Sequence, residues 1–227
     1  MALAHPSLPP LHRHLPGSAN LLGPWYLEMF TKTEWYVVPL IWVPIFSYLF
    51  YRSFEDLSAA GLSSSDALTR AGLCFLLGNA IWTIIEYGMH RWIFHVECWL
   101  PDHPYALSAH FLLHGIHHYL PMDGLRLVMP PILFTALQYP FTQLAYKLFP
   151  VWAANGIISG AFAFYVVYDC FHYAMHHMKL PRLAKGQKSW HMEHHYKEPN
   201  LGFGVSSPVW DWVFGTEFVS RPKNLAK

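Results

Sequence analysis

The sequence predicts an all-α fold: an integral membrane four-helix bundle with a cytosolic, histidine-rich helical cap that holds a di-metal site. Charged residues make up 13% of the 227 residues, about half the usual share of roughly 25%, whereas hydrophobic residues make up 53%. Thirteen of the sixteen histidines fall between His90 and His195. The net charge of +1 creates no overall field that would attract a nucleic acid, so we expect no nucleic-acid partner.

Two apolar runs in the first part of the chain are expected to cross the membrane. Residues 35–51 carry no charge and, at 17 residues, lie at the short limit of roughly 17 to 25 for a spanning helix. Pro39 and Pro44 predict a kink in this span without excluding it. Residues 71–87 are mostly apolar, and their one acid, Glu86, stands near the end, where we expect it at the membrane interface.

Two further runs, residues 127–146 and 153–168, are uncharged and complete the set of four. Only a short stretch with Lys147 and Pro150 separates them, which is typical of a helical hairpin. A soluble protein with four buried core helices is the alternative, because hydropathy separates the two classes poorly for runs of this length.

The positive charges are unevenly divided between the two sides of the expected bundle. Four spans place the N-terminus, the 88–126 loop and the chain from Asp169 onward on one side. That side carries 12 of the 15 Lys and Arg residues, against Arg52, Arg70 and Lys147 on the other. The positive-inside bias therefore predicts that the histidine-rich side faces the cytosol.

A single domain is the simplest account of the chain. The first 24 residues contain no apolar run of the 7 to 15 residues that a secretory signal needs. Three cysteines without a CxxC pair do not suggest a disulfide framework. We expect a soluble lead-in over residues 1–30, the membrane domain over 31–218 and a tail over 219–227.

Twelve histidines form four motifs, which read HRWIFH, HFLLHGIHH, HYAMHH and HMEHH. Residues three and four apart project from the same face of a helix, so three of these motifs each offer convergent imidazoles. Imidazole suits zinc, copper, iron and nickel, and about ten histidines exceed the needs of one ion. The spacing therefore predicts two metal ions with about five nitrogens each. His90 and His95 are five apart, roughly 140° around a regular helix, so they would ligate different metals or flank a helix end.

The remaining histidines and the nearby acids have other expected roles. We interpret His5, His12, His14 and His103 as hydrogen-bonded or snorkelling side chains. His110 and His177 exceed what the two ions need, and a role as ligand or as partner of a ligand stays open.

A metal-bound imidazole commonly donates its other ring N–H to a carboxylate or a carbonyl. Among the acids near the motifs, Asp169 is the first choice for this role because it stands three residues before His172. Glu86, Glu193 and Asp211 are further candidates, with a solvated interfacial charge as the alternative for each.

The motifs HRWIFH, HGIHH, YDCFHYAMHH and WHMEHH, with the tail GFGVSSPVWDWVFGT, resemble the fatty acid hydroxylase superfamily of integral membrane di-metal enzymes. The resemblance covers residues 31–218 and is closest to the fatty acid 2-hydroxylases of sphingolipid synthesis. It implies a four-helix membrane bundle in the endoplasmic reticulum, with two metals under a cytosolic cap. The ligands it implies are His90, His95, His114, His117, His118, His172, His176, His191, His194 and His195.

The resemblance also implies an activity: O2-dependent 2-hydroxylation of long or very long acyl chains, such as the N-acyl chain of ceramides, taken from the bilayer. Iron is the metal expected for catalysis, and zinc could replace it in a purified sample. About 30 residues precede the region of resemblance, too few for the cytochrome b5 domain fused to many relatives. Electrons from NADPH or NADH are therefore expected through a separate cytochrome b5 and its reductase.

Two other functions stay open at this point. A membrane fatty acyl desaturase or a sterol oxidase would share the histidine motifs and the oxygen chemistry. A membrane metal transporter or sensor would also collect histidines, although a transporter is expected to hold its ligands within the spans.

Overall fold

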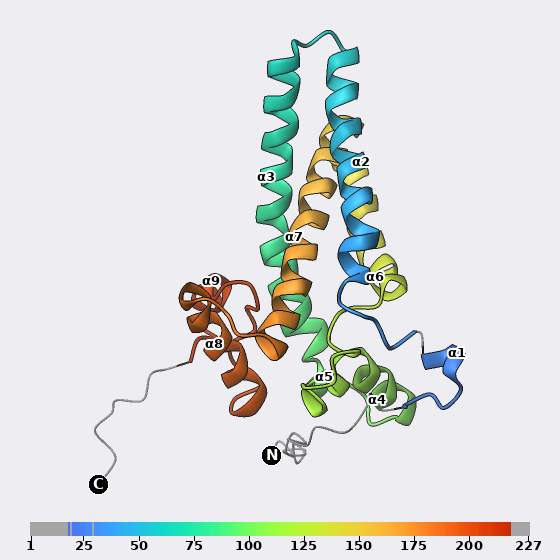
Figure 1. The fold of residues 1–227 in the computed structure, drawn as a ribbon, viewed down its shortest axis with the longest axis vertical. Coiled ribbons are helices and arrows are strands. Elements are labelled where there is room, and N and C mark those ends of the chain that lie inside the picture. Colours follow the sequence, from blue (N-terminus) through green and yellow to red (C-terminus); the bar gives the residue numbers. More distant parts are fainter. Residues whose placement is uncertain (1–17, 19, 29, 219–227) are drawn as a thin grey trace, which may run out of the picture.

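The computed structural model describes residues 18, 20–28 and 30–218, and every regular element among them is helical. Three long helices, α2 (Val37–Ala59), α3 (Ser64–Met89) and α7 (Val151–His177), run side by side, with the shorter α6 (Pro131–Leu148) next to α7 (Figure 1). Short helices gather at one end of this bundle and form a cap. The tail over 219–227, most of the lead-in and His5, His12 and His14 lie outside the described residues.

Three of the four expected spans are helices long and apolar enough to cross a membrane: Val37–Ala59, Ser64–Phe94 and Val151–His177. All three are longer than the apolar runs that predicted them, because a helix does not end where its hydrophobic residues end. α7 continues past Tyr168 through the motif HYAMHH. The membrane helices therefore carry histidines directly into the cap. The expected kink does not end α2, which continues through Pro44.

The fourth expected span differs from the others in composition and in its limits. α6 begins at Pro131, so residues 127–130 are not part of it, and Leu127 is buried against the cap instead. The helix has 18 residues, and Gln138, Gln143 and Lys147 lower its mean hydropathy below that of the three longer helices. It is anchored to α7 by the Tyr146 hydroxyl, which donates to Asn155 Oδ1 at 2.7 Å.

α7 is the central helix of the bundle. Within the described residues, 67% of its most apolar window is buried, against 17% for α2 and for α3, whose apolar side chains face outward as a lipid environment requires. Glycines permit close contact: Gly78 lies against the backbone of Ile157, and Gly160 against the backbone of Phe75. Small residues at such crossings let helix backbones approach without side chains between them.

An aromatic cluster joins the four helices of the bundle. The rings of Phe134 and Tyr165 stack at 3.6 Å between centroids, and Trp42 meets Phe134 edge-on at 4.7 Å. Trp82 packs on both Tyr165 and Tyr168. This packing holds α2, α3 and α6 against the central helix α7 or against one another.

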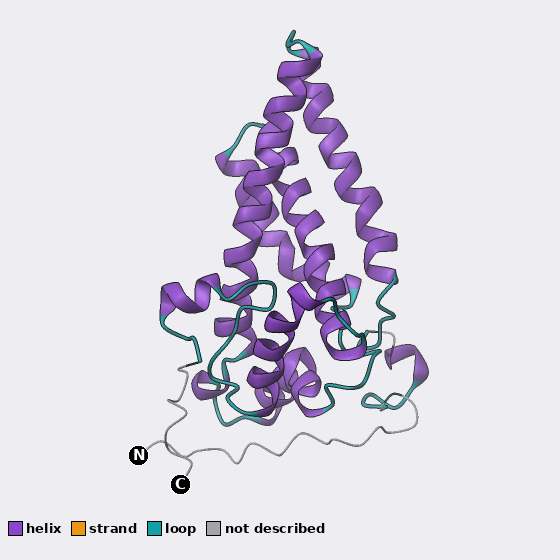
Figure 2. Ribbon diagram, turned by 60° about the vertical axis from the view of Figure 1, so that its left-hand side comes forward, coloured by secondary structure: helices purple, strands orange, loops and turns teal. Residues whose placement is uncertain are grey.

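The cap is broad, and the bundle tapers away from it toward the α2–α3 turn (Figure 2). Figure 1 shows α8 and α9 on one flank of the cap and α1 on the other. The cap elements are α1 (Trp25–Glu28), η1 (His90–Phe94), η2 (Glu97–Trp99), α4 (Pro104–His110), η3 (Phe111–Gly115), α5 (Ile116–Tyr119), η4 (Arg182–Ala184), α8 (Lys185–Tyr196) and α9 (Val209–Phe214).

A buried ion pair joins α1 to the loop that precedes α6. Arg126 donates to Glu28 Oε2 at 2.5 Å, and the backbone N–H of Thr33 donates to the carbonyl of Leu125 at 2.7 Å. Burial opposes the charged form of Glu28, but hydrogen bonds from the Leu22 backbone, Arg126 and the Leu21 backbone outweigh it. Together they lower the pKa of Glu28 to about 2.

Candidate metal centre

Ten histidines of the cap come together in two groups of five. The ring nitrogens within each group lie within 4.8 Å of one another. We call them the first and the second histidine group. The first contains His90, His95, His114, His118 and His194, and the second contains His117, His172, His176, His191 and His195. These are the ten histidines that the sequence resemblance singled out.

A π turn brings His90 and His95 into the same group. Within η1, the backbone N–H of His95 donates to the carbonyl of His90 at 3.0 Å, a bond that spans five residues instead of four. The wider turn removes the roughly 140° that would separate the two side chains on a regular helix. The distortion anticipated from their spacing is therefore present, and both side chains serve the first group.

The motif HGIHH divides its histidines between the groups. His114 and His118, four residues apart, have Nε2 atoms separated by 3.0 Å in the first group. His117 projects about 100° away from His118. Its Nε2 lies 3.0 Å from that of His172 in the second group. The expectation that this motif would present all three imidazoles on one face is wrong. The rotation of about 100° between His117 and His118 directs their side chains into different groups.

The motif HMEHH on α8 makes the opposite division. His191 and His195 have Nε2 atoms 3.1 Å apart in the second group, whereas His194 Nε2 lies 3.1 Å from His95 Nε2 in the first. The two groups are neighbours, since the rings of His118 and His195 stack at 4.2 Å between centroids. Each motif therefore gives two imidazoles to one group and one to the other.

The end of α7 completes the second group. His172 and His176 stand four residues apart on one helix face, and His176 Nε2 lies 2.9 Å from His191 Nε2. These positions exist because α7 continues beyond its apolar run into the cap.

The donor set fits two metal ions of borderline character. The Nε2 to Nε2 separations of 2.9 to 3.2 Å agree with neighbouring ligands at near right angles, since metal to nitrogen bonds of about 2.1 Å then give about 3.0 Å. Tetrahedral neighbours would be about 3.4 Å apart at the same bond length. Five nitrogens in a group also exceed a tetrahedral set. The arrangement suits metals that accept five or six ligands.

The imidazoles are held in the form that binds metals. Burial lowers the pKa of His114, His117, His118 and His195 well below its usual value, and the neighbouring imidazoles lower it further. These rings are therefore neutral at pH 7, and each keeps a lone pair for a metal.

Backbone carbonyls of one loop fix the orientation of two histidines. His90 Nδ1 donates to the carbonyl of Phe203 at 2.5 Å, and His194 Nδ1 donates to the carbonyl of Leu201 at 2.7 Å. Both bonds leave Nε2 free to face the group. Sequence reasoning missed these carbonyls. The glycines Gly202 and Gly204 were the signal in the sequence that the backbone of this loop is closely packed. A side chain at Gly202 would meet Phe218, and one at Gly204 would meet the Ser207 backbone.

The four candidate acids have different surroundings, and Glu193 alone lies at the surface, as the alternative of a solvated charge expected. Glu86 and Asp211 are buried and bind backbone N–H groups of the same loop, so an interfacial charge is the wrong description of them. Asp169 accepts from the Met129 N–H at 3.0 Å and from the Tyr165 hydroxyl at 3.2 Å. Among the described residues, no hydrogen bond joins Asp169 to a histidine. Glu193 forms an exposed ion pair with Lys197 at 3.1 Å.

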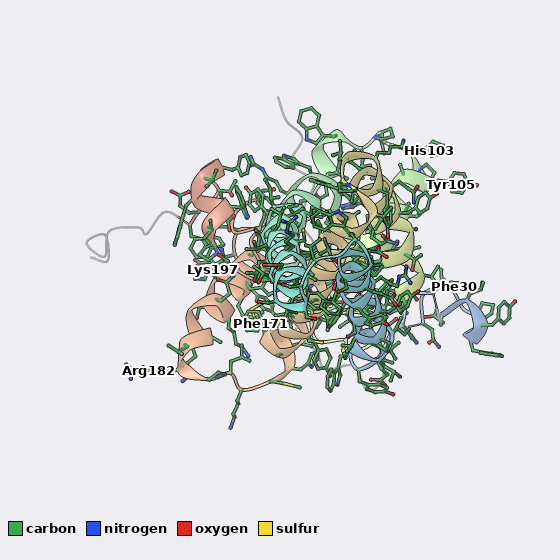
Figure 3. All side chains as sticks on the ribbon, turned by 90° about the horizontal axis from the view of Figure 1, so that it is seen from above. Phe30, His103, Tyr105, Phe171, Arg182 and Lys197 are labelled. Atoms are coloured by element: carbon green, nitrogen blue, oxygen red, sulfur yellow. The ribbon has the colours of Figure 1, made fainter. Side chains whose placement is uncertain are left out.

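The other described histidines lie outside both groups. His110 Nε2 donates to the carbonyl of Phe94 at 2.6 Å, which supports the turn before His95. The ring of His177 stacks on Tyr173 at 4.7 Å. His103 is exposed and lies at the periphery of the molecule when it is viewed along the bundle axis (Figure 3).

A cavity reaches both histidine groups from the side of α6. Its wall includes His114 of the first group and His117 and His172 of the second. Apolar side chains such as Leu113 and Leu133 form much of the remaining wall. Tyr168, Asp169 and Arg126 add polar groups near the histidines. The cavity wall is therefore partly apolar and partly polar, with the polar part next to the histidines.

Comparison with known proteins gives a consistent assignment. The fatty acid hydroxylase family model matches residues 75–216. The chain is 47% identical over 203 residues to a ceramide very long chain fatty acid hydroxylase of Saccharomyces cerevisiae, covering 88% of this chain and 50% of that protein. It is 37% identical over 195 residues to a dihydroceramide fatty acyl 2-hydroxylase of Arabidopsis thaliana, covering 84% and 76%.

The likeness extends to a solved structure and to mammalian proteins. The structure is described as full-length scs7p with only the hydroxylase domain visible. It has a TM-score of 0.84 and 45% identity, covering 91% of this chain and 75% of that one. A fatty acid 2-hydroxylase of Rattus norvegicus is 36% identical over 207 residues, covering 84% of this chain and 54% of that protein. The chain spans about half the length of the yeast and mammalian relatives. It belongs to the fatty acid hydroxylase family.

Proposed function

We propose that this membrane protein catalyses the O2-dependent 2-hydroxylation of long or very long acyl chains, with the N-acyl chain of ceramides as substrate class. The observation that carries the proposal is the pair of five-histidine groups, side by side in the cap that the apolar helices enter. The relatives described as acting on ceramide or dihydroceramide support the choice of substrate.

The two groups would each hold one metal ion, with iron as the catalytic metal and zinc as a possible substitute in purified protein. Bound there, the pair of ions would supply the oxygen activation that an unactivated C–H bond requires. The reaction converts the C–H bond, O2, two electrons and two protons into the C–OH group and water. We propose that a separate cytochrome b5 and its reductase deliver these electrons from NADPH or NADH.

The residues of the chain would bind and orient the acyl group. The apolar cavity wall, with Leu113 and Leu133, would hold the methylene chain and exclude water. Arg126, Tyr168 and Asp169 stand at the polar part of the wall, where they would face the substrate carbonyl. This arrangement would place the carbon next to the carbonyl beside His114, His117 and His172.

The membrane arrangement is part of the proposal. We propose that α6 crosses with α2, α3 and α7 as the fourth helix of the bundle, because it packs on α7 and has only one charged residue. The cap would then face the cytosol, following the distribution of Lys and Arg, in the endoplasmic reticulum membrane.

The histidine positions argue against a transporter. All ten histidines of the two groups lie in or next to η1, in η3, in α5, in α8 or in the last two turns of α7, and none lies near the middle of a long helix. A transport site is expected near the middle of the spans.

The test compares wild type, His172→Ala and His103→Ala in membranes supplied with cytochrome b5, its reductase and NADH. Sphingolipid mass spectrometry then measures 2-hydroxy acyl chains. We expect the product with wild type and with His103→Ala, whose histidine is exposed and outside both groups, and its loss with His172→Ala. New double bonds in place of hydroxyl groups would identify a desaturase instead. Unchanged lipids with altered cellular metal content would identify a transporter or sensor.

A further inference from the structure

The loop over residues 201–206 is held by two buried carboxylates that belong to different helices. Asp211 on α9 accepts from the backbone N–H of Phe203 at 2.8 Å and of Gly204 at 2.9 Å. Glu86 on α3 accepts from the N–H of Val205 at 3.1 Å and of Ser206 at 2.7 Å. Four consecutive backbone N–H groups therefore point at two carboxylates. A carboxylate is a strong acceptor, so this arrangement fixes the loop closely.

Asp211 is linked to His90 through a single peptide unit. The N–H of Gly204 and the carbonyl of Phe203 belong to the same peptide group. The N–H donates to Asp211 Oδ2, and the carbonyl accepts from His90 Nδ1 at 2.5 Å. Hydrogen bonds in such a chain polarise one another, so a negative carboxylate at one end makes the carbonyl a better acceptor at the other. A stronger hydrogen-bond acceptor at Nδ1–H makes the lone pair of Nε2 more basic, so that Nε2 binds a metal ion more strongly.

Burial raises the pKa of Asp211, and the hydrogen-bond donors around it oppose that rise. The Asp211 carboxylate accepts hydrogen bonds from the two loop N–H groups and from the Thr216 hydroxyl at 2.8 Å. The Tyr87 hydroxyl lies 2.8 Å from Thr216 Oγ1, and Arg91 donates to the Tyr87 hydroxyl at 2.9 Å. Since the Thr216 hydrogen is directed at Asp211, the donors form one line that begins at the Arg91 guanidinium. This line favours the ionised carboxylate.

Among the described residues, the hydrogen bonds from this loop to histidines all go to the first group. Its carbonyls accept from His90 and His194, both of the first group. The peptide unit that binds His194 ends in the N–H of Gly202, which donates to the neutral Thr216 carbonyl at 2.8 Å. In the second group, the buried Nδ1 atoms of His191 and His195 have no hydrogen-bond partner among the described residues. The two groups therefore differ in what supports their imidazoles.

We infer that Asp211 and Glu86 are positioning residues for the first histidine group, with Asp211 strengthening His90 as a metal donor through the Phe203–Gly204 peptide, so that the two metal sites are unequal. This inference rests on the proposed metal-holding role of the histidines. The segment GFGVSS would thus connect the two acids to the metal centre. Neither acid would touch a metal itself.

The test measures Zn²⁺ affinity of the purified full chain by competition with a chelator of known strength. Asp211→Asn removes the charge and turns one acceptor into an amide donor facing a backbone N–H. We expect one of the two sites to weaken by about 10- to 100-fold, the range typical of changes in the partners of metal ligands. Glu86→Gln, which acts one peptide further along the loop, is expected to weaken the same site less.

Two backgrounds identify the affected site. A variant with both His172 and His176 changed to Ala reports on the first group, and there Asp211→Asn should weaken binding. A variant with both His90 and His95 changed to Ala reports on the second group, and there it should have no effect. An equal effect in both backgrounds, or none in either, would overturn the inference.

Controls separate this result from loss of folding and from failure of the proposed function. Glu28→Gln removes another buried carboxylate that accepts two backbone N–H groups, at 2.5 and 2.6 Å, far from the loop in sequence, and should leave both affinities unchanged. Circular dichroism of the metal-free variants checks their helix content, and if Asp211→Asn does not fold, Glu86→Gln carries the test. A wild type that binds fewer than two Zn²⁺ ions would instead contradict the two-metal premise itself.

Discussion

The backbone N–H of His95 donates to the carbonyl of His90 at 3.0 Å, and this five-residue bond lets both side chains serve the same histidine group. A second π turn, η3, immediately precedes α5 and ends at Gly115 between two histidines of the neighbouring motif. Such turns are concentrated at functional sites because they change the direction of side chains without ending a helix. In this protein, two of the four histidine motifs, HRWIFH and HFLLHGIHH, each contain a π turn.

Neighbouring histidines of one motif should control different metals. We expect His114→Ala to lower the metal content of the first group and His117→Ala that of the second, each reducing a full complement of two ions to about one. Activity should fall by more than about 100-fold, because substitution of a residue that merely supports a metal ligand already costs about 10- to 100-fold. Metal analysis of the purified variants measures the number of bound ions. Combining each variant with the double changes at His172 and His176 or at His90 and His95 shows which group has lost its ion. His110→Ala, outside both groups, should keep both ions, and loss of the same ion in His114→Ala and His117→Ala would contradict the division.

The contact between α3 and α7 should depend on Gly160. An added Cβ would meet the backbone of Phe75, so Gly160→Ala must push the helices apart, and we expect a loss of about 1–3 kcal/mol of stability. Thermal unfolding in detergent measures the effect. Gly72→Ala on α3 is the matched control, because nothing lies within 4 Å of its added Cβ. It should be neutral or stabilising by up to about 1 kcal/mol. Equal melting temperatures for the two variants would count against this packing.

The Glu28–Arg126 ion pair should make stability depend on acid pH. The pKa of Glu28 is lowered to about 2 in the folded chain from 4.5, so its ionised form stabilises the fold fully above pH 4.5. This contribution is lost as the pH falls from 4.5 through about 2. Wild type should therefore melt above Glu28→Gln at pH 7, and the difference should shrink between pH 4.5 and 2. A difference that is constant over this range would show that the charge of Glu28 is not its source.

Metal removal should loosen the cap and leave the bundle intact. The ten imidazoles converge from four chain segments, and a metal ion in each group would join these segments through the Nε2 atoms that face one another. Metals present at about 1,000 times their dissociation constant contribute about 4 kcal/mol for each site. We expect chelation to accelerate amide hydrogen exchange in α5 and α8 but not in α2. Uniform acceleration along the chain would indicate instead that the metals hold the whole fold.

Much of the site could be predicted because its chemistry is local. The spacing of His191 and His195 along one helix, or of His172 and His176, is enough to place each pair on one face. The division of HGIHH and HMEHH could not be predicted from spacing alone. Which face of α5 meets which group depends on how the short helix packs between α7 and α8.

The acids show the limit of reasoning from sequence distance. Asp169 stands three residues from His172, yet its hydrogen bonds go to Met129 and Tyr165. Asp211 is far from His90 in sequence and reaches it through the Phe203–Gly204 peptide. Contacts made through a backbone carbonyl leave no side-chain signature for a motif search, because any residue supplies the same carbonyl.

The sequence by itself determined the helical class, the membrane character of the long apolar runs and the ten histidines, because hydropathy and residue type act locally along the chain. Only the tertiary structure decided where the helices end, which histidine joins which group and which carboxylates hold the 201–206 loop. These outcomes depend on packing between segments distant in sequence, on two π turns and on close backbone contacts at glycine. Such features result from competition among contacts of the whole fold and cannot be read from any one segment.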